Sequence, residues 1–347
     1  MSNRKFKPVL LSCVAFVAAA AAGIVASGGA SAQTLKAVKD RGAVICGVSH
    51  GLAGFGMPDA NGAWSGLDVD YCRAVAAAVF NDPSKVQFVP ISVEERFDAL
   101  KSGKIDVLAH NSTWTMSREA NYGLTFVGVN YYDGQGFLVH RLPEKASALE
   151  LDGAKVCVQK GTTTIDNFED YFKANNMKYD VVEETSQDDA VKDYSAGKCD
   201  VLTSDVSQLY ALRLQLAKPG DNVILPDVIS KEPLGLAVRQ DDPQWADIVK
   251  WVTFALINAE ELGVSSKTVD DAVKSNKPAV RRLVGAEGNF GEKLGLSADW
   301  AANVVRAVGN YGEIFERNVG SHSKLGIPRG LNELWSTGGI QYAPPIR

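Results

Sequence analysis

Short apolar runs alternate along the chain with segments in which apolar residues recur every three to four positions. The first such series reads strand, helix, strand, helix, strand, an order typical of a parallel open sheet with covering helices. The predicted strands are 43–48, 86–90 and 105–109. The predicted helices are 67–80 and a second that starts after Ser92 and stops at Gly103.

The pattern changes after residue 131, and a second series of strands and helices begins. Its predicted strands are 136–140, 155–159, 181–182 and 199–203, and its predicted helices are 165–174 and 188–194. The proline-containing segment 224–234 is predicted to cross back, so that 235–239 rejoins the first half and a helix follows at 251–262. One half is therefore inserted in the other, and a two-stranded hinge lets two lobes close on a ligand between them.

This organisation predicts the domain bounds. Residues 33–131 and 233–347 form lobe 1, residues 132–232 form lobe 2, and residues 270–347 are a C-terminal extension of lobe 1. The extension contains an amphipathic stripe of four residues, namely Trp300, Val304, Val305 and Val308. We expect it to pack on the outside of lobe 1, although a contact surface for a partner is the alternative.

A sequence echo links the two halves. Gly103 to Leu108 reads G-K-I-D-V-L and Gly197 to Leu202 reads G-K-C-D-V-L, 94 positions later. Each strand is predicted to run into a polar loop, Asn111-Ser112-Thr113 in the first copy and Thr203-Ser204-Asp205 in the second. The first loop leads to the cation Arg118 and the second carries the anion Asp205, which suggests a zwitterion held between two lobes.

The same residues also have simpler structural interpretations. Over six residues the echo can be coincidence, and its aspartates, Asp106 and Asp200, are expected to serve the strand edges. Asp205 can simply cap the helix that follows it, and Arg118 can be a solvated residue at a helix start.

The N-terminal segment reads as a secretory signal peptide over residues 1–32. Arg4, Lys5 and Lys7 precede an apolar run, and Ala30-Ser31-Ala32 provides small residues for cleavage before Gln33. No later apolar run reaches the roughly 20 residues that a bilayer span requires. We therefore expect a soluble protein of the periplasm.

Length, charge and histidine content narrow the functional classes. A chain of 347 residues is long enough for about two domains, and its formal charge of −5 becomes more negative once the cationic leader is removed. An acidic exported protein is a poor candidate for nucleic acid or anionic membrane. The four histidines show no metal-ligand spacing, so neither a metal nor a cofactor is expected.

Four cysteines remain after the leader: Cys46, Cys72, Cys157 and Cys199. In an oxidising compartment an even number permits two disulfides, in three pairings. We favour Cys157 with Cys199, because both lie on short strands of one half, and Cys46 with Cys72, which joins a strand to the helix after it. Four buried free thiols are the alternative.

Several motifs resemble the periplasmic amino-acid-binding proteins of ABC transporters, the type II periplasmic-binding-protein family. They are G-x-W-x-G-L-D-V-D-Y-C at 62–72, L-K-S-G-K-I-D-V-L, N-S-T-W-T-M-S-R, F-V-G-V-N-Y-Y-D-G and V-Q-K-G-T-T, within residues 35–262. The tail, with R-R-L-V-G-A-E-G-N-F-G-E-K-L-G-L and G-G-I-Q-Y-A-P-P-I-R, is similar to the long-chain subgroup that serves general L-amino-acid uptake.

The resemblance implies a two-lobed α/β fold with open, mostly parallel sheets, a membrane permease as partner, and a monomer. It also implies binding roles for the residues that match. Arg118 matches the arginine that holds the ligand α-carboxylate, and Asp205 the acid that pairs with the α-ammonium. The other matching positions are Thr113 (amide and hydroxyl donors), Asn111 (backbone carbonyl facing the ammonium), and Gly161, Thr162 and Thr163 (donors at the helix start of lobe 2).

One departure bears on specificity. Relatives for cationic or polar amino acids place an acid and an aromatic where this chain has Ser49 and Leu52. Phe55, Trp64 or Trp114 is then expected to supply an aromatic wall. The change favours a pocket that grips the backbone zwitterion and tolerates many side chains.

A second functional hypothesis is an enzyme on the same fold, a cyclohexadienyl or arogenate-type dehydratase. It would need a general acid or base in the cleft. Asp205 is expected to be the only carboxylate there, and pairing with an ammonium would lower its pKa. The sequence therefore favours a binding protein over an enzyme.

Overall fold

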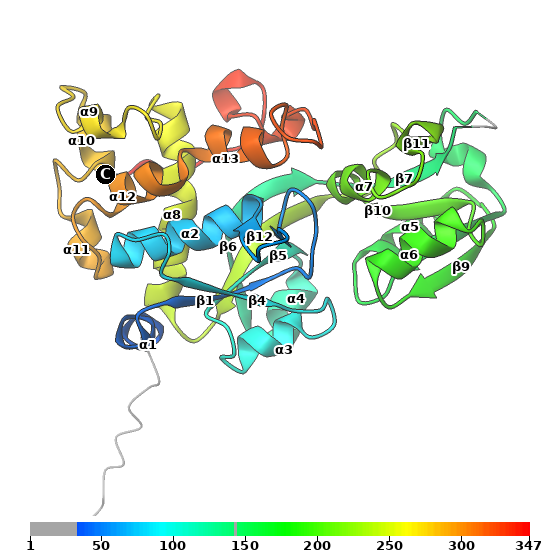
Figure 1. Cartoon of the computed structure of the whole chain (residues 1–347), viewed down its shortest axis with the longest axis horizontal. Coiled ribbons are helices and arrows are strands. Elements are labelled where there is room, and N and C mark those ends of the chain that lie inside the picture. Colours follow the sequence, from blue (N-terminus) through cyan, green and yellow to red (C-terminus); the bar gives the residue numbers. More distant parts are fainter. Residues whose placement is uncertain (1–32, 142–143) are drawn as a thin grey trace, which may run out of the picture.

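The computed structural model describes residues 33–141 and 144–347, so the predicted signal peptide over residues 1–32 lies outside the described residues. The described chain forms two five-stranded sheets and a small ribbon of β2 (Met57–Pro58) with β3 (Trp64–Ser65). Figure 1 shows the two sheets in separate bodies that lie side by side and are bridged by extended chain. No helix in the described ranges combines the length and apolar character that a bilayer crossing needs.

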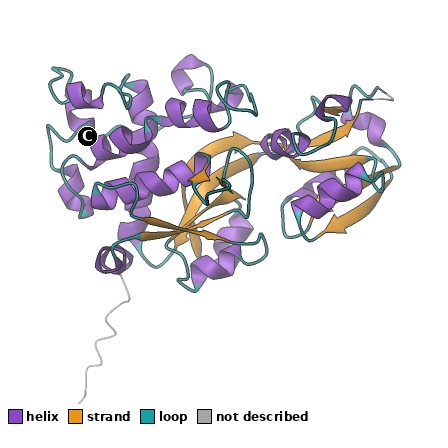
Figure 2. Cartoon of the chain, in the orientation of Figure 1, coloured by secondary structure: helices purple, strands orange, loops and turns teal. Residues whose placement is uncertain are grey.

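The first sheet has the order β4-β1-β5-β12-β6, and only β12 runs against the other four strands. Its strands are β1 (Val44–Val48), β4 (Val86–Pro90), β5 (Val107–Thr113), β6 (Leu124–Asp133) and β12 (Glu232–Arg239). The helices that cover it are α1 (Thr34–Arg41), α2 (Leu67–Phe80), α3 (Arg96–Lys101), α4 (Met116–Tyr122) and α8 (Pro243–Glu261). Helices α2 and α8 cover one face, and α3 and α4 cover the other, each over its own apolar core (Figure 2).

The second sheet repeats this plan with the order β11-β7-β10-β8-β9, in which only β7 is reversed. Its strands are β7 (Gln135–His140), β8 (Ala154–Gln159), β9 (Tyr179–Glu184), β10 (Val201–Asp205) and β11 (Asn222–Ile224). Its helices are α5 (Thr164–Ala174), α6 (Gln187–Ser195), α7 (Val206–Arg213), and the 3₁₀ turns η1 (Ala148–Leu151) and η2 (Pro219–Asp221). Side chains alternate along its strands, so Phe137 packs under α5 while Leu138 faces α6 and α7.

Two extended segments join the sheets. Strand β6 passes through Gly134 into β7, and residues 225–231 lead from β11 back to β12, with Asp133 and Glu232 paired side by side at the crossing. Gly134 is needed at this point, because a Cβ atom there would lie 2.7 Å from the carbonyl oxygen of Ser230. These segments form the predicted two-stranded hinge.

The reversed strand of each sheet is the one that has just crossed the hinge. The carboxyl ends of the remaining strands consequently point toward the space between the sheets. In open α/β sheets, ligands bind outside the carboxyl ends of the strands. Strands β6 and β11 lead into the two connecting segments, so the carboxyl ends of three strands from each sheet, six in all, are left to face one cleft.

Two predicted loops are strand in the structure. Residues 111–113 belong to β5 and residues 203–205 to β10. In β10 the polar side chains mislead because partners inside the sheet satisfy them: Thr203 donates to the carbonyl of Gly136 at 2.8 Å, and the Gln135 amide donates to Thr203 at 2.9 Å. The predicted helix 251–262 also begins earlier, at Pro243, where the Asp242 carboxylate accepts from the backbone N–H of Trp245.

The two copies of the sequence echo lead into equivalent central strands, and the aspartate of each copy makes an equivalent hydrogen bond. Asp106 accepts a 2.8 Å hydrogen bond from the backbone of Ile45 on β1, and Asp200 accepts one of 2.9 Å from Lys155 on β8. Both aspartates therefore have a structural role at the start of a strand, as predicted. Each fixes the entry of one central strand beside its parallel neighbour.

Both predicted disulfides are present. Cys46 of β1 is bonded to Cys72 of α2, and Cys157 of β8 is bonded to Cys199, just before β10. Each bond therefore lies within the structure built around one of the two sheets.

The C-terminal segment packs on the side of the first sheet covered by α2 and α8. It contains α9 (Val269–Ala272), α10 (Pro278–Leu283), α11 (Phe290–Leu294), α12 (Trp300–Val308), α13 (Tyr311–Asn318), η3 (Gly330–Asn332) and η4 (Trp335–Thr337). Trp300, Val304, Tyr311 and Phe315 are buried in the same core as α2 and α8. Arg317 of α13 also forms an ion pair with Asp70 of α2, at 2.7 Å.

Candidate functional site

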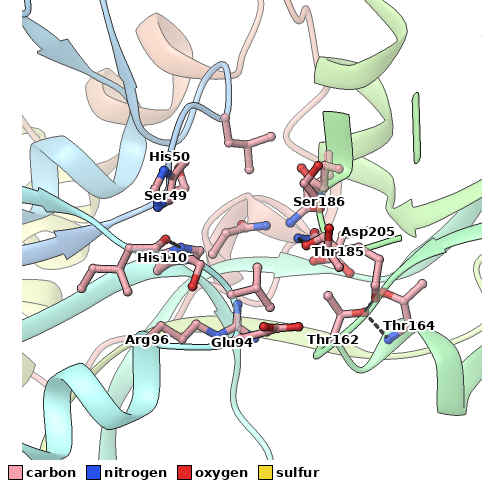
Figure 3. Close-up of a pocket in the computed structure, with 18 of the residues that line it drawn as sticks. Ser49, His50, Glu94, Arg96, His110, Thr162, Thr164, Thr185, Ser186 and Asp205 are labelled. Carbon is pink, nitrogen blue, oxygen red and sulfur yellow. Dashed lines mark hydrogen bonds between the residues drawn. The ribbon is translucent and has the colours of Figure 1, made fainter. Parts of the chain in front are cut away.

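A cavity of about 410 Å³ lies between the two sheets, at the carboxyl ends of their strands. Its lining comes from both sides: Ser49 to Leu52 follow β1, Ile91 to Glu94 follow β4, Asn111 and Thr113 end β5, Thr162 to Thr164 follow β8, Thr185 to Asp188 follow β9, and Asp205 ends β10. Figure 3 shows the two groups of side chains facing one another across this space.

Arg118 lies in the first turn of α4, whose N-terminus is capped by the hydroxyl of Thr115. Its Nη1 donates to the carbonyl oxygen of Thr113 at 2.7 Å, and its guanidinium lies 5.2 Å from the centre of the Phe97 ring. Burial lowers the pKa of Arg118, while the nearby carboxylates of Glu232 and Asp205 act in the opposite direction. The guanidinium retains further donors for a carboxylate in the cavity.

Asp205 faces the same cavity from the other sheet. Asp205 precedes α7, but its side chain makes no capping hydrogen bond. The alternative prediction, that Asp205 caps this helix, is therefore wrong. The side chain is buried, and this burial raises the pKa of Asp205 well above its usual range, with Asp133 and Glu232 adding to the rise. The charges of Arg118 and Arg96 oppose this rise, but Asp205 forms no ion pair with either arginine, so an ammonium in the cavity would pair with it directly.

The expectation that Asp205 is the only carboxylate near the ligand is wrong. Glu94 and Asp188 also line the cavity. Glu232, which has no predicted role, is only 2 % exposed at the start of β12. It accepts from the hydroxyl of Thr113 and, at 2.9 Å, from that of Thr163. The signal available in the sequence was its position within the predicted second crossing, residues 224–234.

These contacts change the roles expected of three threonines. The hydroxyls of Thr113 and Thr163 are directed to Glu232, and that of Thr162 donates to the carbonyl of Gln159 at 2.8 Å. Their hydroxyls are thus engaged within the protein, and backbone N–H groups at the start of α5 are the donors left for an anion. Gly161, in the left-handed conformation at φ 73°, shapes the turn before α5 and lies outside the cavity lining.

Asn111 and His110 both line the cavity, His110 having no role in the sequence-based site. Asn111 adopts a strained φ of 46°, and neither end of its buried side-chain amide has a partner within the described residues. The Nε2 atom of His110 lies 2.8 Å from the carbonyl oxygen of Ile91, and burial lowers the pKa of His110 to about 4. His110 is therefore neutral at physiological pH.

Ser49 and Leu52 line the cavity, but none of the three proposed aromatic walls does. Phe55 is buried in the core, Trp64 lines a different surface hollow, and Trp114 stacks on Phe126 at 5.8 Å. The aromatic-wall prediction is wrong because each ring has a packing partner elsewhere. The cavity is lined by hydroxyl, amide and charged side chains together with the apolar side chains of Leu52, Ile91 and Val93.

The fold and the cleft define a two-lobed α/β binding protein, and comparison with known sequences gives the family. The chain belongs to the bacterial extracellular solute-binding proteins, family 3, whose family model matches residues 44–268. The resemblance drawn from the motifs is thereby confirmed. The match ends before α9, so the C-terminal segment lies beyond the common family unit.

Some relatives match nearly the whole chain, including the C-terminal segment. The chain is 55% identical over 325 residues to the general L-amino acid-binding periplasmic protein AapJ of Rhizobium johnstonii, covering 93% of this chain and 95% of the relative. It is 50% identical over 334 residues to the glutamate/glutamine/aspartate/asparagine-binding protein BztA of Rhodobacter capsulatus, covering 96% and 99%. A solved structure from Brucella ovis, a periplasmic binding protein with glutathione bound, superposes with a TM-score of 0.89 at 53% identity, covering 90% of this chain and 99% of that one.

Proposed function

We propose that this protein captures L-amino acids in the cleft between its two sheets by their shared zwitterionic head group. It is a periplasmic solute-binding protein of an amino-acid ABC transporter, and its partners are a small-molecule ligand and membrane permease subunits. The observation that carries the proposal is the placement of Arg118 and Asp205 on opposite sides of one cavity without an ion pair between them.

The proposed lobes follow the sequence-based bounds, 33–131 with 233–347 and 132–232, and the proposed assembly is a monomer. The α-carboxylate is held by Arg118 and the N–H groups at the start of α5, and the α-ammonium by Asp205. Since these contacts ignore the side chain, they support broad specificity. Each charge-assisted hydrogen bond contributes about 1.5–3 kcal/mol. Several of them, less the cost of immobilisation, give micromolar affinity, about −8 kcal/mol.

The test is calorimetry of the mature protein against the twenty L-amino acids and glutathione. Arg118→Ala and Asp205→Ala should each weaken binding of every amino acid by a similar factor, about 10–100-fold. Lys101→Ala, on the exposed end of α3, is the control and should change nothing. If either substitution weakened binding only of amino acids with one class of side chain, recognition through the head group would be contradicted.

The second candidate, a dehydratase on this fold, needs a proton-transfer group in the cleft. The raised pKa of Asp205 is a feature that such an enzyme would also use. The relatives that cover the chain nearly end to end are solute-binding proteins, however, which favours binding. Turnover of prephenate-like acids by the wild type, lost in Asp205→Asn, would reverse this preference.

A further inference from the structure

Asn111, near the end of β5, has a backbone conformation that is unusual inside a strand. Its φ of 46° lies in the left-handed region, which is unfavourable for a residue with a side chain. The other two described non-glycine residues with positive φ, Asn81 and Asn176, follow helices α2 and α5, where this conformation commonly ends a helix. Asn111 ends no helix, and strained residues of this kind cluster at ligand sites.

The pairing of β5 is irregular at the same point. Leu108 lies opposite Ala237 of β12 and Ser112 lies opposite Gly235, so four steps along β5 correspond to two along β12. On its other side, β5 pairs with β1 only as far as Leu108. A bulge of this kind takes residues out of the ladder and redirects their side chains, and bulges are frequent beside functional sites. Residues 109–111 are thus released from regular pairing at the edge of the cavity.

A buried carboxylate holds Asn111 in this conformation. Asp68, in the first turn of α2, is only 2% exposed, and its Oδ2 accepts a 2.8 Å hydrogen bond from the backbone N–H of Asn111. Its Oδ1 accepts from the side-chain amide of Asn130 on β6 at 3.0 Å. Burial raises the pKa of Asp68 to about 6, against these two hydrogen bonds. An acid is therefore kept in the core at a cost, and it supplies the acceptor that the bulged backbone of Asn111 needs.

The side-chain amide of Asn111 has no partner in the described protein. Asn111 is 8% exposed and lines the cavity, yet neither its Oδ1 nor its Nδ2 makes a hydrogen bond within the described residues. His110, the residue before it, lies on the first-sheet side of the cavity in Figure 3. A buried amide without partners is costly, and a ligand that offers both a donor and an acceptor removes that cost. An amino-acid head group offers both, through its ammonium and its carboxylate.

We propose that Asp68 is a positioning residue of the ligand site, and that it acts through Asn111, whose strained backbone turns the side-chain amide toward the ligand. Asp68 itself does not line the cavity. The inference rests on the proposed function, because it assumes that an amino acid occupies the cavity. It adds to the site one residue that touches the ligand and one that supports it from α2.

Calorimetry with L-glutamine as the probe tests both roles. Asn111→Gly tolerates the positive φ and removes only the amide, and it should weaken binding about 10–100-fold. Asp68→Ala should weaken binding by a similar factor. Because Asp68 acts through Asn111, the double variant should bind no more weakly than Asn111→Gly alone. Unchanged affinity in Asn111→Gly, or additive effects in the double variant, would overturn the inference.

Two further variants separate positioning from a general loss of structure. Asn130→Ala, the matched control, removes the other hydrogen bond to Asp68 and should leave affinity within about threefold. Asp68→Asn keeps an acceptor oxygen for the Asn111 N–H and should retain affinity within about threefold of the wild type. If Asn130→Ala weakened binding as much as Asp68→Ala, or if Asp68→Asn failed to bind, the inference would be wrong.

The outcome remains decisive if Asp68→Ala does not fold, because Asn111→Gly and Asp68→Asn still test the contact and the acceptor. A wild-type protein that binds none of the twenty amino acids would overturn the proposed function. A wild type that binds L-glutamine, with Asn111→Gly equally tight, would overturn only the role of Asp68 and Asn111. The two failures are therefore distinguishable.

Discussion

The carboxylate of Glu232 accepts a 2.9 Å hydrogen bond from the hydroxyl of Thr163, and so ties the start of β12 in the first sheet to the start of α5 on the second. The same carboxylate accepts from Thr113 on β5, from Asn167 of α5 at 2.6 Å, and from Ser230 at 2.8 Å. One buried side chain thus links both sides of the cleft at its hinge.

Glu232→Gln should lower the free energy of unfolding by about 1–3 kcal/mol, because an amide has one acceptor oxygen and cannot accept all four hydrogen bonds. Denaturant titration measures this change. Glu261→Gln, at an exposed position at the end of α8, is the matched control. Unchanged stability of Glu232→Gln would show that this network contributes nothing at the hinge.

Ligand affinity should rise with pH up to the raised pKa of Asp205. The pKa of Asp205 is well above its usual value in the free protein, and only the ionised carboxylate pairs with an ammonium. Below that pKa, affinity for an amino acid should fall by up to about tenfold per pH unit, and binding should release a proton. Calorimetry in two buffers with different heats of ionisation measures the release.

Asp205→Asn is the control for that dependence. This variant should bind weakly at every pH and release no proton. A wild-type affinity that does not change with pH would contradict pairing through Asp205.

Asp133 should make stability fall as pH rises. Burial, with a contribution from Glu232, raises the pKa of Asp133 from 3.8 to about 7, against the hydrogen bonds from Ser207 and Gly134. Between these two values the folded state keeps a proton that the unfolded state has lost, so stability falls with pH and levels off above about 7. One proton limits the slope to about 1.4 kcal/mol per pH unit.

The isosteric change Asp133→Asn should remove that contribution. Its unfolding free energy, measured from pH 4 to pH 8, should decline less with pH than that of the wild type. The exposed Asp98→Asn on α3 serves for comparison. Parallel pH profiles for wild type and Asp133→Asn would refute the assignment.

Removal of residues 269–347 should abolish a stable fold, although the family model ends at residue 268. The deletion exposes the α2 and α8 surface against which Trp300, Tyr311 and Phe315 are buried. Loss of one such aromatic costs about 3–5 kcal/mol, against a total stability of about 5–15 kcal/mol. Circular dichroism and size-exclusion chromatography would show this, with removal of Arg347 alone as control. A monodisperse, folded truncation would contradict the prediction.

Much of the architecture was predictable because helix and strand periodicities are local. The runs around Val44, Val86 and Val156, and the amphipathic helix from Leu67, appear where the pattern places them. The hinge followed from the order of these runs, and the disulfides from which strands share a half. The motif around Arg118 and the echo ending at Asp205 likewise directed attention to two residues that line one cavity.

What the sequence determined by itself was the set of elements, the family resemblance, and the two opposite charges at Arg118 and Asp205. Only the tertiary structure decided that residues 111–113 are strand, that Glu232 receives the hydroxyls of two threonines, and that Arg96 is buried beside Arg118. The physical reason is that periodicity is a property of neighbouring residues. Burial, partners and pKa values depend instead on segments far apart in the chain that meet at the cleft.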